Sequence, residues 1–298
     1  MTETAQRTHK SRFHRSEVLP GFSFQERDRN ILVACFEYRY LTRLQIQRLA
    51  DIPCVTRVNI RLRKLFDHQL LDRRFIPTPT GALQTIYFVG RRGDVYVGQE
   101  LGLESKQVAR RIRLNRQVKI GMISHDLAVS DFRIDVVKQV RGDERFIVEK
   151  WLDPGECERR FELNEAGRRV VTTLKPDGFF QVLHNGQRYS FFVEVDLSTS
   201  NHKKLASKFT NYVRLRQPGL SASAYGIQNY HVLVITKSAS RRSNLKKLIE
   251  DSFSQAEYFW FANCADLGDI PFTVPIWYRT GQEHPRALFQ SPKVRVIR

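Results

Sequence analysis

The chain has 298 residues, of which 41% are hydrophobic, and this is enough to bury a sizeable core in about two domains and excludes disorder throughout. Its formal net charge of +18 favours a polyanionic partner, because lysines and arginines that neutralise phosphates release condensed counterions. An anionic membrane surface attracts the same charge. The sequence has no apolar run of about eighteen residues and no apolar signal-peptide stretch near its start, so we expect no membrane partner and a cytoplasmic protein.

The cysteines are far apart in the sequence and form no C-x-x-C pair. They are Cys35, Cys54, Cys157 and Cys264. This spacing argues against a zinc ribbon and against a disulfide framework. We therefore expect reduced thiols, scattered through the core and the surface.

Residues 1–24 are basic and polar with little periodicity, so we expect a flexible basic arm or simply a disordered tail. Residues 25–104 show helical spacing and then two β-rich runs. The expected elements are a helix from Arg27, a helix from Arg43 to Ala50 capped by Thr42, a helix from Pro53 to about Leu71, and a hairpin of Arg73 to Pro77 with Thr85 to Val89. This order is typical of a winged helix-turn-helix domain.

The third of these helices has an apolar face, from Val58 to Phe66, and is otherwise basic or polar. In a winged helix it lies in the major groove of double-stranded DNA, so we expect Arg57, Asn59 and Arg61 to reach base edges. Further contacts to DNA are expected from Lys64, Arg73, Arg74, Arg110, Arg111 and Arg113. A protein partner, or basic faces that are only solvated, are the alternatives.

Residues 105–119 contain no acidic side chain and separate the winged helix from the C-terminal part of the chain. We interpret them as a basic linker that contacts phosphate, or as the first exposed turns of a long helix whose apolar stripe continues to about Val140.

Residues 120–265 form a second predicted domain, and residues 266–298 a C-terminal extension. After the long helix the period changes to that of strands. Strands are expected at Phe146 to Val148, Phe179 to Leu183, Tyr189 to Leu197, Tyr230 to Thr236 and Tyr258 to Phe261, with helices at Lys204 to Arg216 and Leu245 to Phe253. The order predicts a mixed α and β domain with an α-β-β-β-α-β core.

Carboxylates mark two neighbouring strands of this domain. Asp177 stands at the entry to one strand, and Glu194 and Asp196 lie on one face of its hairpin partner, because side chains alternate along a strand. Two carboxylates among apolar neighbours repel each other unless a cation compensates. Asp177 and Glu194 are therefore predicted ligands of magnesium or manganese, and a salt-bridge network is the alternative.

Pro176-Asp177 followed by Glu194-x-Asp196, on an α-β-β-β-α-β core, resembles the PD-(D/E)XK nuclease superfamily over residues 113–261. The resemblance implies a metal-dependent DNA endonuclease, but that pattern has a catalytic lysine where this chain has Asp196. Lys208 on the following helix is our candidate substitute, and Lys204 is the second choice. Asp126 or His125 are further candidates for the cluster.

The chain also resembles the replication-relaxation family of plasmids and other mobile elements over about residues 27–217. The motifs that carry this resemblance are Tyr40-Leu41-Thr42, Arg61-Leu62-Arg63-x-Leu65-Phe66, Leu71-Asp72-Arg73, Ser124-His125-Asp126-Leu127, Lys175-Pro176-Asp177-Gly178 and Phe192-Val193-Glu194-Val195-Asp196. It implies a role in plasmid replication and in relaxing plasmid DNA. Replication proteins and a second copy of the chain, in a homodimer, are further expected partners.

Three functions remain open at this point. The first is a magnesium-dependent DNA nickase or endonuclease, and the second is a non-catalytic replication initiator with a degenerate nuclease fold. The third is a transcription regulator. Relaxation through a phosphotyrosine on Tyr212 or Tyr225 is disfavoured, because the sequence lacks the paired metal histidines of such relaxases.

Overall fold

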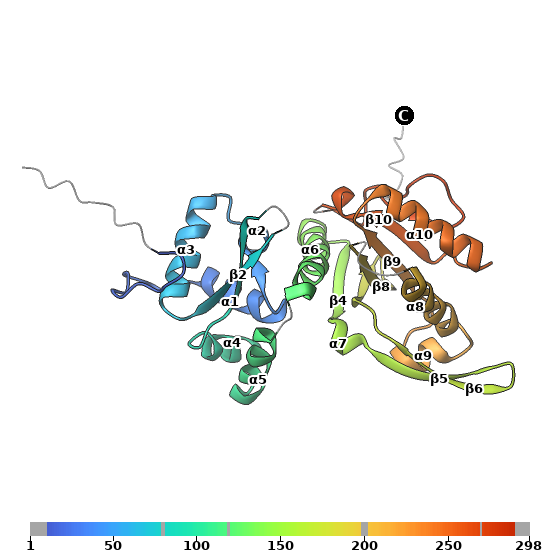
Figure 1. The fold of residues 1–298 in the computed structure, drawn as a ribbon, viewed down its shortest axis with the longest axis horizontal. Coiled ribbons are helices and arrows are strands. Elements are labelled where there is room, and N and C mark those ends of the chain that lie inside the picture. The colour runs from blue at the N-terminus through green and yellow to red at the C-terminus, as the bar shows by residue number, and fades with distance from the viewer. Residues whose placement is uncertain (1–10, 79–80, 118–119, 198–201, 269, 290–298) are drawn as a thin grey trace, which may run out of the picture. The chain divides into compact units, whose positions relative to one another are not determined.

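The structure is a computed structural model that describes residues 11–78, 81–117, 120–197, 202–268 and 270–289 (Figure 1). It divides into two compact units, residues 1–130 and 131–298, and the boundary falls inside helix α6, Ile120–Gly142. Both units contain helices and strands, which confirms the mixed α and β class. None of the helices in the described ranges is long and apolar enough to span a bilayer.

The first unit contains helices around a small antiparallel sheet. Its elements are α1 Glu26–Glu37, β1 Leu41–Thr42, α2 Arg43–Leu49, α3 Val55–Asp67, β2 Leu71–Pro77, β3 Leu83–Val89, α4 Asp94–Leu101, α5 Ser105–Arg116 and the first part of α6. The strand order is β1-β3-β2. The hairpin strands begin earlier than predicted, at Leu71 and Leu83, and α3 ends earlier, because Gln69 has a positive φ of 60° that a helix does not accommodate.

Local sequence signals explain the start of α2 and the packing of α3. The Thr42 hydroxyl accepts a hydrogen bond from the Gln45 backbone N–H at 3.2 Å, and the Gln45 side chain accepts one from the Thr42 N–H at 2.9 Å. This capping box confirms the predicted cap. The predicted apolar face of α3, from Val58 to Phe66, is buried.

Helix α5 lies within residues 105–119, which we expect from the sequence to be either a basic linker or the first turns of a long helix. Val108 and Ile112, one turn apart, are buried, while Arg110 and Arg113 are exposed. The segment is therefore an amphipathic helix of its own that packs against α4 and β3, and it ends at Arg116.

The second unit is built on a mixed sheet with the order β11-β10-β9-β8-β7-β4. Its elements are β4 Phe146–Leu152, α7 Pro154–Cys157, β5 Arg159–Glu165, β6 Arg168–Leu174, β7 Gly178–His184, β8 Gln187–Asp196, α8 His202–Leu215, α9 Leu220–Tyr225, β9 His231–Thr236, α10 Ala239–Ser252, β10 Phe259–Asn263, the 3-10 helix η1 Cys264–Asp266 and β11 Tyr278–Arg279. Strands β4, β7 and β8 pair antiparallel, and β8, β9 and β10 pair parallel. The predicted strands and helices are present, with their ends shifted. The predicted cap at residues 198–201 lies outside the described residues.

Apolar side chains cover both faces of this sheet. Phe179 and Phe192 point into a core shared with α8 and α10, whereas Phe180 packs edge-on against Phe132 of α6. The segment after β10 also enters the core, because Phe272 and Trp277 are fully buried. The predicted C-terminal extension therefore belongs in part to this unit.

The hairpin of β5 and β6 forms a sheet separate from the main one, and the sequence analysis did not predict it (Figure 1). Ala166 and Gly167 at its turn have φ values of 48° and 78°, which a two-residue hairpin turn requires. Phe161 and Leu163 on alternate positions of β5 are buried, which is the period of a strand.

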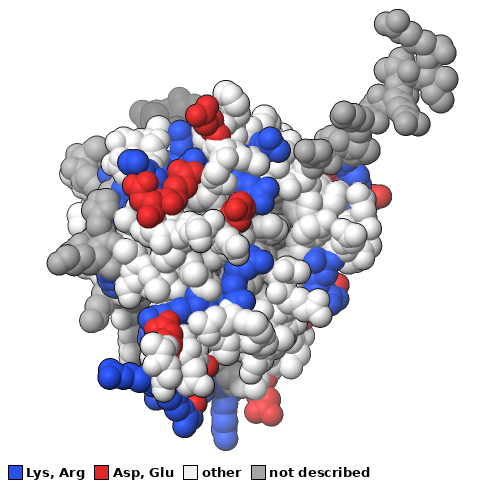
Figure 2. All heavy atoms as spheres, turned by 90° about the vertical axis from the view of Figure 1, so that its right-hand side faces the viewer, with Lys and Arg blue, Asp and Glu red and all other residues white. Residues whose placement is uncertain are grey.

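One face of the molecule carries charges of both signs (Figure 2). On the face drawn in Figure 2, basic and acidic side chains lie interspersed. The formal excess of +18 is therefore not a continuous basic field on this face.

Candidate functional site

Asp177 and Glu194 are held side by side by the pairing of β7 with β8. The Asp177 backbone N–H donates to the Val193 carbonyl at 3.0 Å, which extends the ladder by one residue beyond β7. The Val195 backbone N–H donates to Asp177 Oδ2 at 2.8 Å. This contact orients the Asp177 carboxylate along β8, beside Glu194.

The ammonium of Lys208 joins the two carboxylates. Lys208 lies on α8, and its Nζ is 3.3 Å from Asp177 Oδ1 and forms an ion pair with Glu194 Oε2. The Glu194 side chain is 3% exposed, whereas Lys208 is 23% exposed. The cluster is thus buried on the sheet side and open to solvent on the side of the lysine.

Burial and the neighbouring charges set the protonation of this cluster. The pKa of the Glu194 carboxyl is raised to about 7, because burial and the charge of Asp177 raise it by more than Lys208 lowers it. Burial alone would lower the pKa of Lys208, but Glu194 and Asp177 together raise it above its usual value. Lys208 therefore stays a cation at neutral pH, while Glu194 titrates near neutrality.

Tyr212 completes the cluster from α8, one turn after Lys208. Its hydroxyl donates to Glu194 Oε1, and burial raises the pKa of Tyr212 well above its usual value. The tyrosine is fully buried, so its oxygen is a hydrogen-bond donor to Glu194 and not an accessible nucleophile. This role of Tyr212 was not predicted, although the i, i+4 spacing of Lys208 and Tyr212 places them on one helix face. Tyr225, the other tyrosine considered, donates to the Cys157 carbonyl at 2.8 Å.

Asp196 occupies the position where the nuclease pattern has lysine. Arg241 on α10 donates to its Oδ2 at 2.5 Å, and the Asp196 side chain is 2% exposed. The structure thus gives Asp196 an arginine partner on a different helix from Lys208. Lys204, the second-choice lysine, is exposed on α8.

Asp126, which was considered as a further member of the cluster, makes its contacts within the first unit. It accepts hydrogen bonds from the Tyr40 hydroxyl at 2.6 Å and from Arg39 at 3.2 Å. His125 Nδ1 lies 3.7 Å from Asp126 Oδ1. In the ranges that the structure describes, no three or more His, Cys, Asp or Glu side chains gather as they would around a metal ion.

The second candidate site is the basic face of α3. Arg57 and Asn59 are exposed. Arg61 instead forms an ion pair with the fully buried Asp28 of α1 and donates to the Ser23 carbonyl at 2.8 Å. Arg61 was predicted to reach base edges, but its guanidinium is bound within the protein.

Residues 11–24 contact side chains of the second half of α3, from Arg61 onward, and of the hairpin. Lys64 donates to the Gly21 carbonyl at 3.0 Å, and Arg73 donates to the Arg12 carbonyl. Two other residues predicted to contact DNA also bind within the protein: Arg74 donates to the Arg116 carbonyl at 2.9 Å, and Arg111 donates to the Glu37 carbonyl at 3.1 Å. Arg110 and Arg113, by contrast, are exposed. The structure leaves Arg57, Asn59, Arg110 and Arg113 as the exposed members of the predicted set.

The fold and the sites define an α+β protein with a basic helical unit and a carboxylate–lysine cluster on a mixed sheet. A family model described as replication-relaxation matches residues 34–229, which is more than half of the chain. The chain belongs to the replication-relaxation family. The matched residues include α3, Asp177, Glu194 and Lys208. No curated protein and no solved structure matches the chain.

Arg61→Ala is expected to lower the free energy of unfolding by about 3 kcal/mol, because it leaves the carboxylate of Asp28 buried without its cation. Arg57→Ala, an exposed position on the same helix, is the control and is expected to change it by less than about 0.5 kcal/mol. Urea unfolding measures both. Equal stability of the two variants would contradict a structural role for the Arg61–Asp28 pair.

Lys208→Met is expected to destabilise the fold more at about pH 8.5 than at about pH 6. The folded-state pKa of Glu194 is raised above its unfolded value, so the stability linked to its proton is present at low pH and is lost as the pH rises through about 7. Removing Lys208 takes away a cation that lowers the pKa of Glu194, so the ionised Glu194 then destabilises the folded state more. Urea unfolding at both pH values measures the effect, with Lys204→Met as the control on the same helix. A penalty that is the same at both pH values would rule out this coupling.

Proposed function

We propose that this protein binds double-stranded DNA in plasmid or mobile-element replication and nicks it in a divalent-metal-dependent reaction. The observation that carries the proposal is the meeting of Lys208 with Asp177 and Glu194, which come from a helix and two strands. Two acidic residues and a lysine are the groups that the PD-(D/E)XK pattern combines, although in this chain the lysine comes from α8 and not from the strand. Replication proteins as partners and a homodimer stay predictions.

The element order of the first unit supports a winged helix-turn-helix domain that binds DNA. Helices α1, α2 and α3 precede the hairpin of β2 and β3, and β1 pairs with β3, which is the element order of that fold. In this proposal α3 lies in the major groove. Base contacts come from Arg57 and Asn59, which are exposed, and phosphate contacts from Arg110 and Arg113 on α5.

The second unit supports a nuclease-like core. Helix α6 is followed by the antiparallel strands β4, β7 and β8, then by α8 and by β9 parallel to β8. This is the α-β-β-β-α-β order with the β5–β6 hairpin inserted after α7. The carboxylates lie at the entry to β7 and near the end of β8, next to the helix that supplies the lysine.

The donor set of the cluster fits a hard divalent cation. Asp177 Oδ1 and Glu194 Oε2 both contact the Lys208 ammonium, so the two oxygens face a common point, and a divalent ion bound there would take the place of the ammonium. Magnesium prefers oxygen ligands and uses one or two carboxylates together with waters and substrate phosphates, so two carboxylates suffice. When bound, such an ion lowers the pKa of a water molecule and stabilises charge on the phosphate.

Lys208 supplies positive charge in this proposal and does not act as a base. Its raised pKa keeps the ammonium protonated, and a fixed cation beside the scissile phosphate stabilises the negative charge that develops on the phosphate oxygens. Tyr212 and the Val195 N–H hold Glu194 and Asp177 in orientation.

One observation favours the second candidate, a non-catalytic DNA-binding initiator. Lys208 pairs with both Asp177 and Glu194, and Arg241 pairs with Asp196, so the protein's own two cations already offset most of the negative charge of the three carboxylates. A degenerate nuclease scaffold in which ion pairs stabilise the sheet would have this arrangement.

Conversion of supercoiled plasmid to the relaxed form separates these candidates. We expect the native protein to nick DNA with magnesium and not with a chelator present. Asp177→Asn and Lys208→Met are expected to lower the rate by about a hundredfold or more, because each removes a metal ligand or a charge-stabilising group. Lys204→Met is the control and should cut at the native rate. Absence of metal-dependent nicking by the native protein would establish the non-catalytic reading.

Arg57→Ala is expected to weaken binding of duplex DNA by about 1–3 kcal/mol and to relax its sequence preference, because the proposal gives the Arg57 guanidinium a base contact. A slope of log affinity against log salt that falls by about 0.9, with unchanged sequence preference, would indicate a phosphate contact instead. Arg168→Ala, an exposed position on β6, removes the same charge and is the control. Fluorescence anisotropy over a salt series measures both, and identical curves for the two variants would exclude α3 as the DNA-reading helix.

A further inference from the structure

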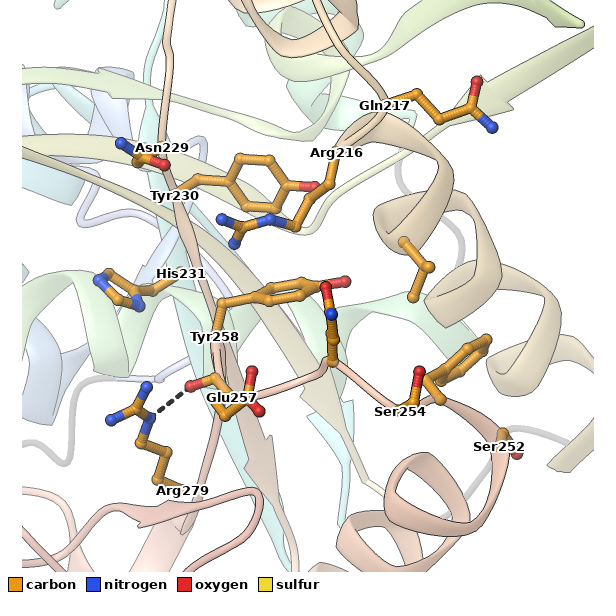
Figure 3. A pocket seen from close by; sticks show the side chains of 13 residues that line it. Arg216, Gln217, Asn229, Tyr230, His231, Ser252, Ser254, Glu257, Tyr258 and Arg279 are labelled. Atoms are coloured by element: carbon orange, nitrogen blue, oxygen red, sulfur yellow. Dashed lines mark hydrogen bonds between the residues drawn. The ribbon is translucent and has the colours of Figure 1, made fainter.

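A pocket of about 810 Å³ lies in the second unit, away from the carboxylate cluster (Figure 3). It is formed where β9 and β10 begin, between the end of α8 and the end of α10, and its lining includes Asn229, Tyr230, His231 and Tyr258. His231 pairs with Phe191 of β8, three residues before Glu194 in the same strand, so the pocket and Glu194 are about 10 Å apart along the sheet.

Two arginines contribute positive charge to the pocket. The Arg216 guanidinium lies over the Tyr258 ring, 4.3 Å from its centroid, and the Arg279 guanidinium lies 5.5 Å from the centroid of Trp260. Arg279 donates to the backbone carbonyl of Glu257 at 2.5 Å (Figure 3). Within the described residues neither arginine forms an ion pair with a carboxylate, in contrast to Arg61 or Arg241.

The positive charges of the two arginines also affect His231, the histidine of the lining. Burial, together with the charges of Arg279 and Arg216, lowers the pKa of His231 to about 4. His231 is therefore neutral at physiological pH. Glu257 is the acidic residue of the lining and is exposed, so the two arginines leave the pocket with a net positive charge.

A buried polar atom without a partner lies in the same lining. The Tyr258 side chain is 5% exposed, and its hydroxyl has no hydrogen-bond partner among the described residues. The adjacent Tyr230 hydroxyl, by contrast, donates to the Tyr212 carbonyl at 2.5 Å. A buried hydroxyl without a partner is destabilising, and such groups in folded proteins usually meet water or a ligand. Figure 3 shows Tyr258 in the middle of the lining, below Arg216.

We propose that this pocket binds the phosphate group of a nucleotide through the Arg216 and Arg279 guanidinium groups, with the Tyr258 hydroxyl as a further donor. Arginine suits this ligand because its planar fork donates two parallel hydrogen bonds to phosphate oxygens. The side-chain amides of Asn229 and Gln217 in the lining offer donors and acceptors to the rest of the nucleotide. This site does not depend on nicking by the Asp177 cluster.

A free nucleotide and a DNA strand carry the same phosphate chemistry, so the test uses both. Thymidine 5′-monophosphate and a short single-stranded oligothymidine are titrated into the full-length protein by calorimetry, in a chelating buffer that prevents metal-dependent cutting. Binding of the mononucleotide assigns the pocket to a free nucleotide, and binding of the oligonucleotide alone assigns it to a strand backbone. We expect Arg216→Ala and Arg279→Ala to lower the affinity about tenfold or more, because each removes charged hydrogen bonds.

The controls separate the pocket from general charge and from folding. Lys247→Ala removes one positive charge from an exposed position on α10 and should bind like the native protein. Tyr258→Phe should weaken binding but raise the melting temperature, because it removes the buried hydroxyl that has no partner. Failure of the native protein to bind either probe would overturn the proposal, as would equal affinities of Arg216→Ala and Lys247→Ala.

Discussion

The ion pair of Lys208 with two carboxylates is the interaction on which the second unit's site depends. Asp177 and Glu194 are brought together by the register of β7 and β8, which satisfies the backbone but places like charges next to each other. A carboxylate that is 3% exposed cannot be solvated by bulk water, so a cation must come from elsewhere in the fold. Helix α8 provides it, and the docking of α8 on the sheet and the charge balance of the strands therefore depend on each other.

The same physical constraint recurs in the first unit. Asp28 is fully buried in α1 and binds Arg61, and Asp67 at the end of α3 binds Arg63. Some of the basic residues of α3 therefore stabilise the unit and are not available to a partner. The high net charge of the chain therefore overstates the positive charge that α3 offers to a partner. The proposed DNA contact consequently rests on the exposed Arg57 and Asn59.

The sequence predicted much of the secondary structure because the signals are local. The capping box of Thr42 with Gln45 and the apolar face of α3 are contained within a few neighbouring residues. The sequence also predicted a divalent ion at Asp177 and Glu194 and Lys208 as the substitute for the missing lysine, and the structure places Lys208 beside both carboxylates. The hairpin of β5 and β6 was missed, since its strands carry many charged residues and its burial depends on packing against α8.

By itself, the sequence determined many of the elements, the family and the identity of the candidate carboxylates, because periodicity, caps and motifs are properties of short segments. Only the tertiary structure decided which charge pairs with which. Arg241 is forty-five positions from Asp196, and Arg61 is thirty-three from Asp28, so no local pattern relates them. The pocket around Arg216 and Tyr258 likewise exists only because α8, α10 and the starts of two parallel strands meet there. Long-range ion pairs follow from packing, since burial determines which charges must find a partner.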